Sequence, residues 1–101
     1  MINRNGPNTD PAKPLTYIVP MQTKDEMINL IKGVMKEVWG RIGSEQYTEA
    51  ERILQLACWD EWVNTTPGLV VTLNRLRSDE ITIEQAAIDI NSCIDLLNII
   101  T

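Results

Sequence analysis

Residues 81–97 read ITIEQAAIDINSCIDLL, and this stretch indicates the fold class most clearly. Thr82 and Gln85 have the spacing of a capping box, which marks the start of a helix. Behind them, apolar residues recur every three or four positions, at Ile83, Ala86, Ala87, Ile90, Ile94 and Leu97. This period predicts an amphipathic helix with one face in a core. Ile88, Ile99 and Ile100 lie off that face, which indicates either a contact with a second subunit or wide burial within one chain.

Two long helices are predicted upstream by the same signals. The first begins after Thr23, with Glu26 completing a capping box, and its apolar positions are Met27, Leu30, Ile31, Val34, Val38 and Ile42. The second begins after Thr48, with Glu51 three residues later. Its apolar stripe consists of Ala50, Ile53, Leu54 and Ala57, widened by Leu56, Trp59, Trp62 and Val63. This width predicts burial of the second helix on more than one side.

Pro67 interrupts the helical pattern, because proline lacks the N–H that a helix interior needs. With Thr66 as N-cap and Pro67 as the first helical residue, a short helix is predicted to run to Arg77. Leu15–Pro20 is apolar, is bounded by prolines and has no partner strand in sight, so we expect it to lie extended over the helices. Residues 1–14 are rich in Asn and Pro and are predicted to form a flexible tail.

The predicted fold class is therefore all-α, with residues 15–101 forming a single helical domain. An extended N-terminal segment is followed by two long antiparallel helices, a short helix and a C-terminal helix, in an oligomeric helical bundle. No apolar run approaches the ~20 residues that span a bilayer, and residues 1–14 contain no apolar core of a signal peptide. We therefore expect a cytoplasmic protein that does not bind membranes.

Charge is distributed unevenly along the chain. All bases lie in residues 1–77, where acids balance them, and the net charge of −5 arises from the acidic C-terminal quarter. Its acids are Asp79, Glu80, Glu84, Asp89 and Asp95. A binder of long nucleic acid needs a contiguous basic face, which this balance does not provide. The acidic end is either a solvated helix face or a docking site for a basic partner.

The composition argues against an enzyme. Histidine, the commonest general base and metal ligand, is missing from the chain. No metalloprotease, hydrolase or nucleotide-binding loop motif occurs, and the adjacent Asp60 and Glu61 would point in different directions on a helix. Cys58 and Cys93 lie far apart and are predicted to be small buried thiols, with a disulfide as the alternative. We expect no catalytic residue, no metal and no cofactor.

Some side chains suit an anionic, planar ligand. Tyr17 offers a ring on which a base can stack, and Lys32 and Lys36 share one helix face. Arg41 and Arg52 lie near the turn between the first two helices. The alternative interpretation is that Tyr17 lies at the edge of the core and that the lysines only keep the surface soluble.

The run Leu15–Pro20 (LTYIVP) resembles the LTYxxP opening of the phage anti-CBASS cyclic-oligonucleotide sponges, a family of small helical proteins. Further matches follow in the same order, and the similarity covers roughly residues 13–66. Lys36, Glu37 and Val38 are similar to a Lys-Glu-Leu of the family's first long helix, with Ile42 at a later apolar position. Ile53, Leu56, Trp62 and Asn64 resemble the spacing of its second helix, including a Trp-x-Asn.

The resemblance implies a hexamer that holds cyclic dinucleotides between subunits. Tyr17, with Pro20 in the same run, falls where the family stacks a base, and Lys32 falls where it binds a phosphate. The family also uses an arginine soon after the Trp-x-Asn, whereas this chain has Leu69 and Val70 there. The nearest arginines are Arg75 and Arg77, which we include in the predicted ligand site with Lys36.

We therefore expect a phage-type immune-evasion protein that sequesters cyclic di- or oligonucleotide messengers without cleaving them, in the host cytoplasm if it is phage-encoded. One alternative is a small phage or bacterial inhibitor that docks its acidic last helix onto a basic host protein. Another is an oligomerisation domain without a ligand.

Overall fold

The computed structural model describes residues 14–99. It contains four helices: α1 (Lys24–Ile42), α2 (Glu49–Asp60), α3 (Leu69–Arg77) and α4 (Ile83–Ile99). A small antiparallel hairpin of β1 (Trp62–Val63) and β2 (Thr66–Pro67) lies between α2 and α3. The predicted tail, apart from Pro14, and Ile100 lie outside the described residues.

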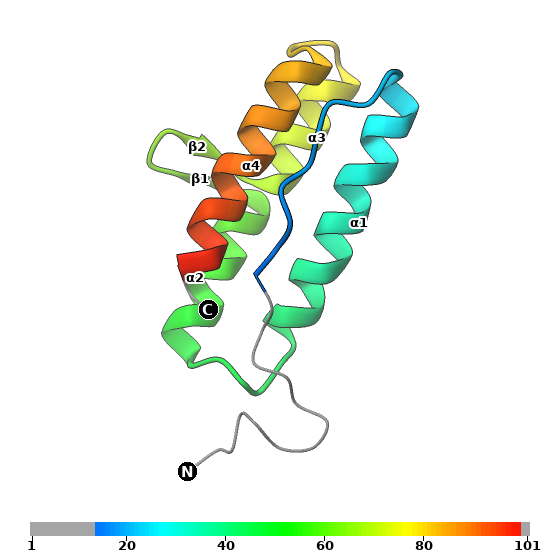
Figure 1. The fold of residues 1–101 in the computed structure, drawn as a ribbon. Helices are drawn as coiled ribbons and strands as arrows, with labels where there is room; N and C mark the ends of the chain where they lie inside the picture. The colour runs from blue at the N-terminus through cyan, green and yellow to red at the C-terminus, as the bar shows by residue number, and fades with distance from the viewer. Residues whose placement is uncertain (1–13, 100–101) are drawn as a thin grey trace.

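The helices pack as three antiparallel segments, of which α2 and α3 together form one (Figure 1). α1 runs in one direction, α2 and α3 return one after the other, and α4 runs back alongside them. α3 contacts both α1 and α4, and α2 also contacts both of these helices. The mostly helical fold is therefore confirmed. No helix among residues 14–99 has the length and apolar character that crossing a membrane would require.

Local capping signals begin three helices where the sequence predicts. Thr23 and Thr48 accept hydrogen bonds from the backbone N–H groups of Glu26 and Glu51, each at 3.2 Å. Thr82 accepts one from Gln85 N–H at 3.0 Å. The predicted core faces of α1 and α4 are also confirmed. Buried core positions on these two helices include Met27, Ile31, Val34, Val38, Ala86, Ala87, Ile90, Ile94 and Leu97.

The predicted burial of α2 is wrong. Ile53, Leu54 and Leu56 are exposed, and the buried residues of this helix are Gln55 and Cys58. The apolar stripe of Ala50, Ile53, Leu54 and Ala57 marks one side of this helix, but that side is not the buried one. Packing against α1, α3 and α4 selects it, and one apolar side of α2 remains in solvent.

The predicted extension of the second helix to Val63, and the start of the third at Thr66 and Pro67, are also wrong. Val63 pairs with Thr66 across a two-residue turn, in which Asn64 adopts a left-handed conformation with φ 57°. Asparagine tolerates this conformation better than most residues, so the chain reverses here instead of continuing as a helix. Pro67 lies in β2, and Gly68 is the N-cap of α3.

Residues 14–20, which we call the strap, lie extended across the bundle between α1 and α4 (Figure 1). Leu15 N–H donates to Asn98 Oδ1 at 2.7 Å, and Asn98 Nδ2 donates back to Leu15 O at 3.2 Å. Asn91 holds Ile18 in the same way: Ile18 N–H donates to Asn91 Oδ1 at 2.9 Å, and Asn91 Nδ2 donates to Ile18 O at 3.0 Å. Three extended residues and seven helical residues both span about 10 Å, so the two amides meet the strap in register. The prediction of an extended segment laid over the helices is confirmed.

Both cysteines are buried free thiols, as predicted. Cys93 Sγ on α4 donates to the backbone carbonyl oxygen of Cys58 on α2 at 3.3 Å. The contact with Cys58 and burial both raise the pKa of the Cys93 thiol. A thiol held in its protonated form is a poor nucleophile, so Cys93 contributes packing between α2 and α4.

Candidate functional site

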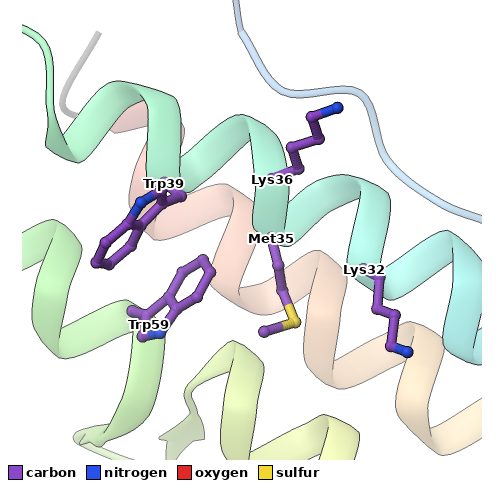
Figure 2. A pocket seen from close by; sticks show the side chains of 5 residues that line it. All are labelled: Lys32, Met35, Lys36, Trp39 and Trp59. Atoms are coloured by element: carbon purple, nitrogen blue, oxygen red, sulfur yellow. The ribbon is translucent and has the colours of Figure 1, made fainter.

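A hollow of about 430 Å³ lies on the outer side of α1 where α2 approaches it. Its lining residues are Lys32, Met35, Lys36 and Trp39 of α1, together with Trp59 of α2 (Figure 2). The four α1 residues follow the spacing i, i+3, i+4, i+7, which places them on one helix face. A volume of this size falls within the range of small-molecule pockets.

Two tryptophans form the aromatic part of the hollow. The ring centroids of Trp39 and Trp59 are 5.2 Å apart, and their planes are inclined by 47°. This geometry is a favourable tilted aromatic pair, and it leaves no room for a third ring between them. Trp39 is 57% exposed, so a face of its indole is open to a planar group arriving from solvent.

Two lysines supply positive charge to the same hollow. Lys32 and Lys36 are exposed on α1, and neither amine forms an ion pair with another residue of the described range 14–99. Figure 2 shows their side chains leaving the helix in different directions, with Lys36 directed to the side on which the strap is drawn. Two separated ammonium groups near the indole rings of Trp39 and Trp59 can bind an anion that also carries a flat ring.

Tyr17 and Pro20 lie on the strap, away from that hollow. Tyr17 lines a separate groove of about 400 Å³ between the strap and α1, which also includes Gly33 and Glu37. Its hydroxyl donates a hydrogen bond to Asp95 Oδ1 on α4. Pro20 is exposed near the end of the strap. Tyr17 and the two lysines, predicted to share one site, therefore line different hollows of the structure.

The hydrogen bond to Asp95, and then the negative charge of this carboxylate, raise the pKa of Tyr17. A raised folded-state pKa means that the contact stabilises the strap fully below the ordinary tyrosine pKa of about 10 and is lost as the pH rises through the raised value. Asp95→Asn should lower the pH at which Tyr17 ionises, measured by tyrosinate absorbance. The Tyr17→Phe variant, in which Tyr47 is the remaining tyrosine, provides the baseline for the absorbance measurement. Identical titrations of the wild type and Asp95→Asn would contradict the assignment.

Arg75 and Arg77, the other predicted ligand residues, lie at the end of α3. The Arg75 guanidinium lies 5.5 Å from the Trp62 ring centroid and 3.7 Å from Asp89 Oδ2. It therefore joins the hairpin to α4. The backbone carbonyl of Arg77 accepts a hydrogen bond from Lys24 Nζ at 3.0 Å, and its own side chain is exposed. Neither arginine lines the hollow of Lys32 and Lys36.

The remaining candidate bases also lie apart from this hollow. Arg41 is mostly buried, and Arg52 lines a shallow groove with Ile42, Glu49, Ile53 and Leu56. Trp39 and Met35 were missed as site residues in the sequence. The sequence did contain a signal for Trp39, because Lys32, Lys36 and Trp39 are spaced by four and three residues and so share one helix face. The position of Trp59, which lies on α2, beside Trp39 depends on the tertiary fold.

No protein-family model matches the chain, and no curated protein or solved structure matches it. The similarity to the anti-CBASS sponges thus stays a prediction from short sequence motifs. Among residues 14–99, no cluster of three or more acidic or cysteine side chains is arranged to hold a metal ion. The aromatic hollow with its two lysines is therefore the candidate functional site.

Proposed function

We propose that the protein binds and sequesters cyclic di- or oligonucleotide messengers without cleaving them. The observation that carries this proposal is the pairing of an exposed tryptophan with two lysines in one hollow. A cyclic nucleotide presents flat bases and phosphates, so it matches both features of the hollow. A tight and abundant binder would lower the free messenger by mass action and thereby prevent antiphage signalling.

Each lining group has a distinct part in this proposal. One base stacks on the open face of Trp39, while Trp59 supports the other side of that ring. Lys32 and Lys36 bind phosphates with charge-assisted hydrogen bonds. Stacking contributes about 1–3 kcal/mol per base. The absence of histidine from the chain supports binding without hydrolysis, because the commonest general base is missing.

An oligomer is part of the proposal, and the resemblance suggests a hexamer. The hollow is shallow and Trp39 is largely exposed, so one protomer would cover only part of a cyclic dinucleotide. Tyr17 and Pro20, which the resemblance assigns to the ligand, line another part of the surface. Their participation would need a second protomer to bring them to the lysines of the first.

The alternative of an acidic docking helix has less support. Asp79 pairs with Lys24 at 2.7 Å, Asp89 lies 3.7 Å from Arg75, and Asp95 accepts the Tyr17 hydroxyl. Glu80 accepts the Ser78 hydroxyl at 2.8 Å, so four of the five C-terminal acids already have partners within the protomer. We retain nucleotide sequestration as the single proposed function.

Calorimetric titration with a panel of cyclic di- and trinucleotides tests the proposal. We expect saturable binding, and about ten- to a hundredfold weaker binding by Trp39→Ala and by Lys32→Ala. Lys32→Ala should also reduce the salt dependence, because a screened charge contact is removed. Trp62→Ala is the matched control, since this exposed tryptophan lies outside the hollow.

Chromatography of the ligand after denaturing the complex should recover it unchanged. Wild-type protein that binds none of the panel would disprove sequestration. Unaltered affinity in both folded variants would leave sequestration standing and reject the hollow as its site. Linear product in proportion to protein would show an enzyme.

A further inference from the structure

The groove between the strap and α1, which we call the strap groove, is a second hollow of the molecule, with a volume of about 400 Å³. From α1 it is lined by Leu30, Gly33, Val34 and Glu37, which follow the spacing i, i+3, i+4, i+7 on one helix face. This set is offset by two residues from the set that lines the hollow of Lys32 and Lys36. Two residues correspond to about 200° of rotation around a helix, so the two hollows lie on nearly opposite sides of α1.

The two hollows also differ in charge. Among the described residues, Glu37 is the only charged one that lines the strap groove, and its carboxylate forms no ion pair with another residue of 14–99. Its neighbour in sequence, Lys36, lines the other hollow and not this groove. A second carboxylate, that of Asp95, lies at the hydroxyl of Tyr17. A ligand in the strap groove therefore meets negative charge, which favours a cation.

The other walls of the strap groove suit an apolar body. Val19 on the strap and Leu30 and Val34 on α1 provide aliphatic surface. Tyr17 is 57% exposed, and the hydrogen bond of its hydroxyl to Asp95 holds the ring at this groove. The face of a phenol ring attracts an ammonium group, because the ring quadrupole is negative there.

Gly33 keeps space open in the strap groove, since a Cβ atom at this position would meet nothing within 4 Å. We propose that the strap groove binds a free primary amine of small size, whose ammonium group lies between the Glu37 carboxylate and the Tyr17 ring and whose apolar body lies against the aliphatic walls. This site does not share lining residues with the proposed nucleotide site. The failure of either proposal therefore leaves the other unaffected.

A nuclear magnetic resonance titration with phenethylamine, which is protonated at neutral pH, tests the chemistry of the ligand. We expect saturable shifts of the Gly33 amide that weaken with added salt, and no comparable shift at Gly40, which lies outside the groove. Hydrocinnamate carries a similar ring with the opposite charge and should bind about tenfold more weakly. Equal binding of the two probes would overturn the proposal. Tighter binding of Nα-acetyl-lysine amide than of phenethylamine would assign the groove to a lysine of a partner protein instead.

Two pairs of variants test the location of the site. Gly33→Leu should fill the groove and prevent saturable binding of phenethylamine, whereas Gly40→Leu should not, although both positions are open and both variants gain a better helix former. Glu37→Gln should weaken binding about two- to fivefold, whereas Glu45→Gln, which removes the same charge from an exposed site outside the groove, should not. Wild-type affinity in folded Gly33→Leu protein, or equal effects within either pair, would overturn the proposal.

Discussion

Gly68→Ala is expected to lower the free energy of unfolding by about 1–3 kcal/mol or more, because the new methyl group has no space. Gly68 is the buried N-cap of α3, where the chain leaves the hairpin. A Cβ atom there would lie 2.4 Å from Glu61 O, 3.0 Å from Glu61 N and 3.1 Å from Cys58 O. All three are backbone atoms at the end of α2, so no flexible side chain can move aside.

Two other glycines provide matched controls for this variant. A Cβ at Gly33 or Gly40 on α1 would meet nothing within 4 Å. Alanine at either position should therefore raise the free energy of unfolding by up to about 1 kcal/mol, since alanine is the better helix former. Chemical denaturation of the three variants measures the contrast. A Gly68→Ala protein as stable as the wild type would contradict the packing between α2, the hairpin and α3.

The double variant Asn91→Ala, Asn98→Ala should release the strap from α4. Each asparagine makes two hydrogen bonds with the strap backbone, at Ile18 and at Leu15. Loss of each amide should cost about 1–3 kcal/mol, and exposure of the buried Leu15 and Ile18 side chains adds to this. The free energy of unfolding and the hydrogen exchange of the Leu15 and Ile18 amides are the measurements.

Asn74→Ala is the control for the strap experiment, because Asn74 is an exposed asparagine on α3. This variant should leave both the stability and the exchange of the strap amides close to wild type. The double variant should instead exchange the Leu15 and Ile18 amides rapidly. Wild-type protection in the double variant would show that the strap is held by packing alone.

The candidate site shows how far residue patterns reach toward function. Lys32 and Lys36 were predicted as ligand residues on one helix face, and both line the same hollow. Tyr17 was predicted to join them, but its hydroxyl bonds to Asp95 on the far side of the strap. The neighbours of a residue within one helix follow from its spacing in the sequence. The position of the strap relative to α1 depends instead on its contacts with α4, which lies far along the chain.

The sequence by itself determined the start of α2, the buried faces of α1 and α4, and the extended course of the strap. These features depend on residues within one or two turns of each other: a threonine that bonds the third N–H, an apolar period of 3.6, and prolines that prevent a helix. Such signals do not need the rest of the molecule, so they can be recognised in a linear chain.

Only the tertiary structure decided which side of α2 is buried and where the hairpin forms. It also decided how Asn91 and Asn98 hold the strap, and that Trp59 lies against Trp39 beside two lysines. The apolar stripe of α2 marks the side that stays in solvent, and contacts with α1, α3 and α4 select the side that is buried. The asparagines are also ambiguous in sequence, because a polar residue on a helix can face solvent or a backbone segment. The physical reason is the same in each case: the deciding partner is distant in the chain, and only packing of the whole core brings it within reach.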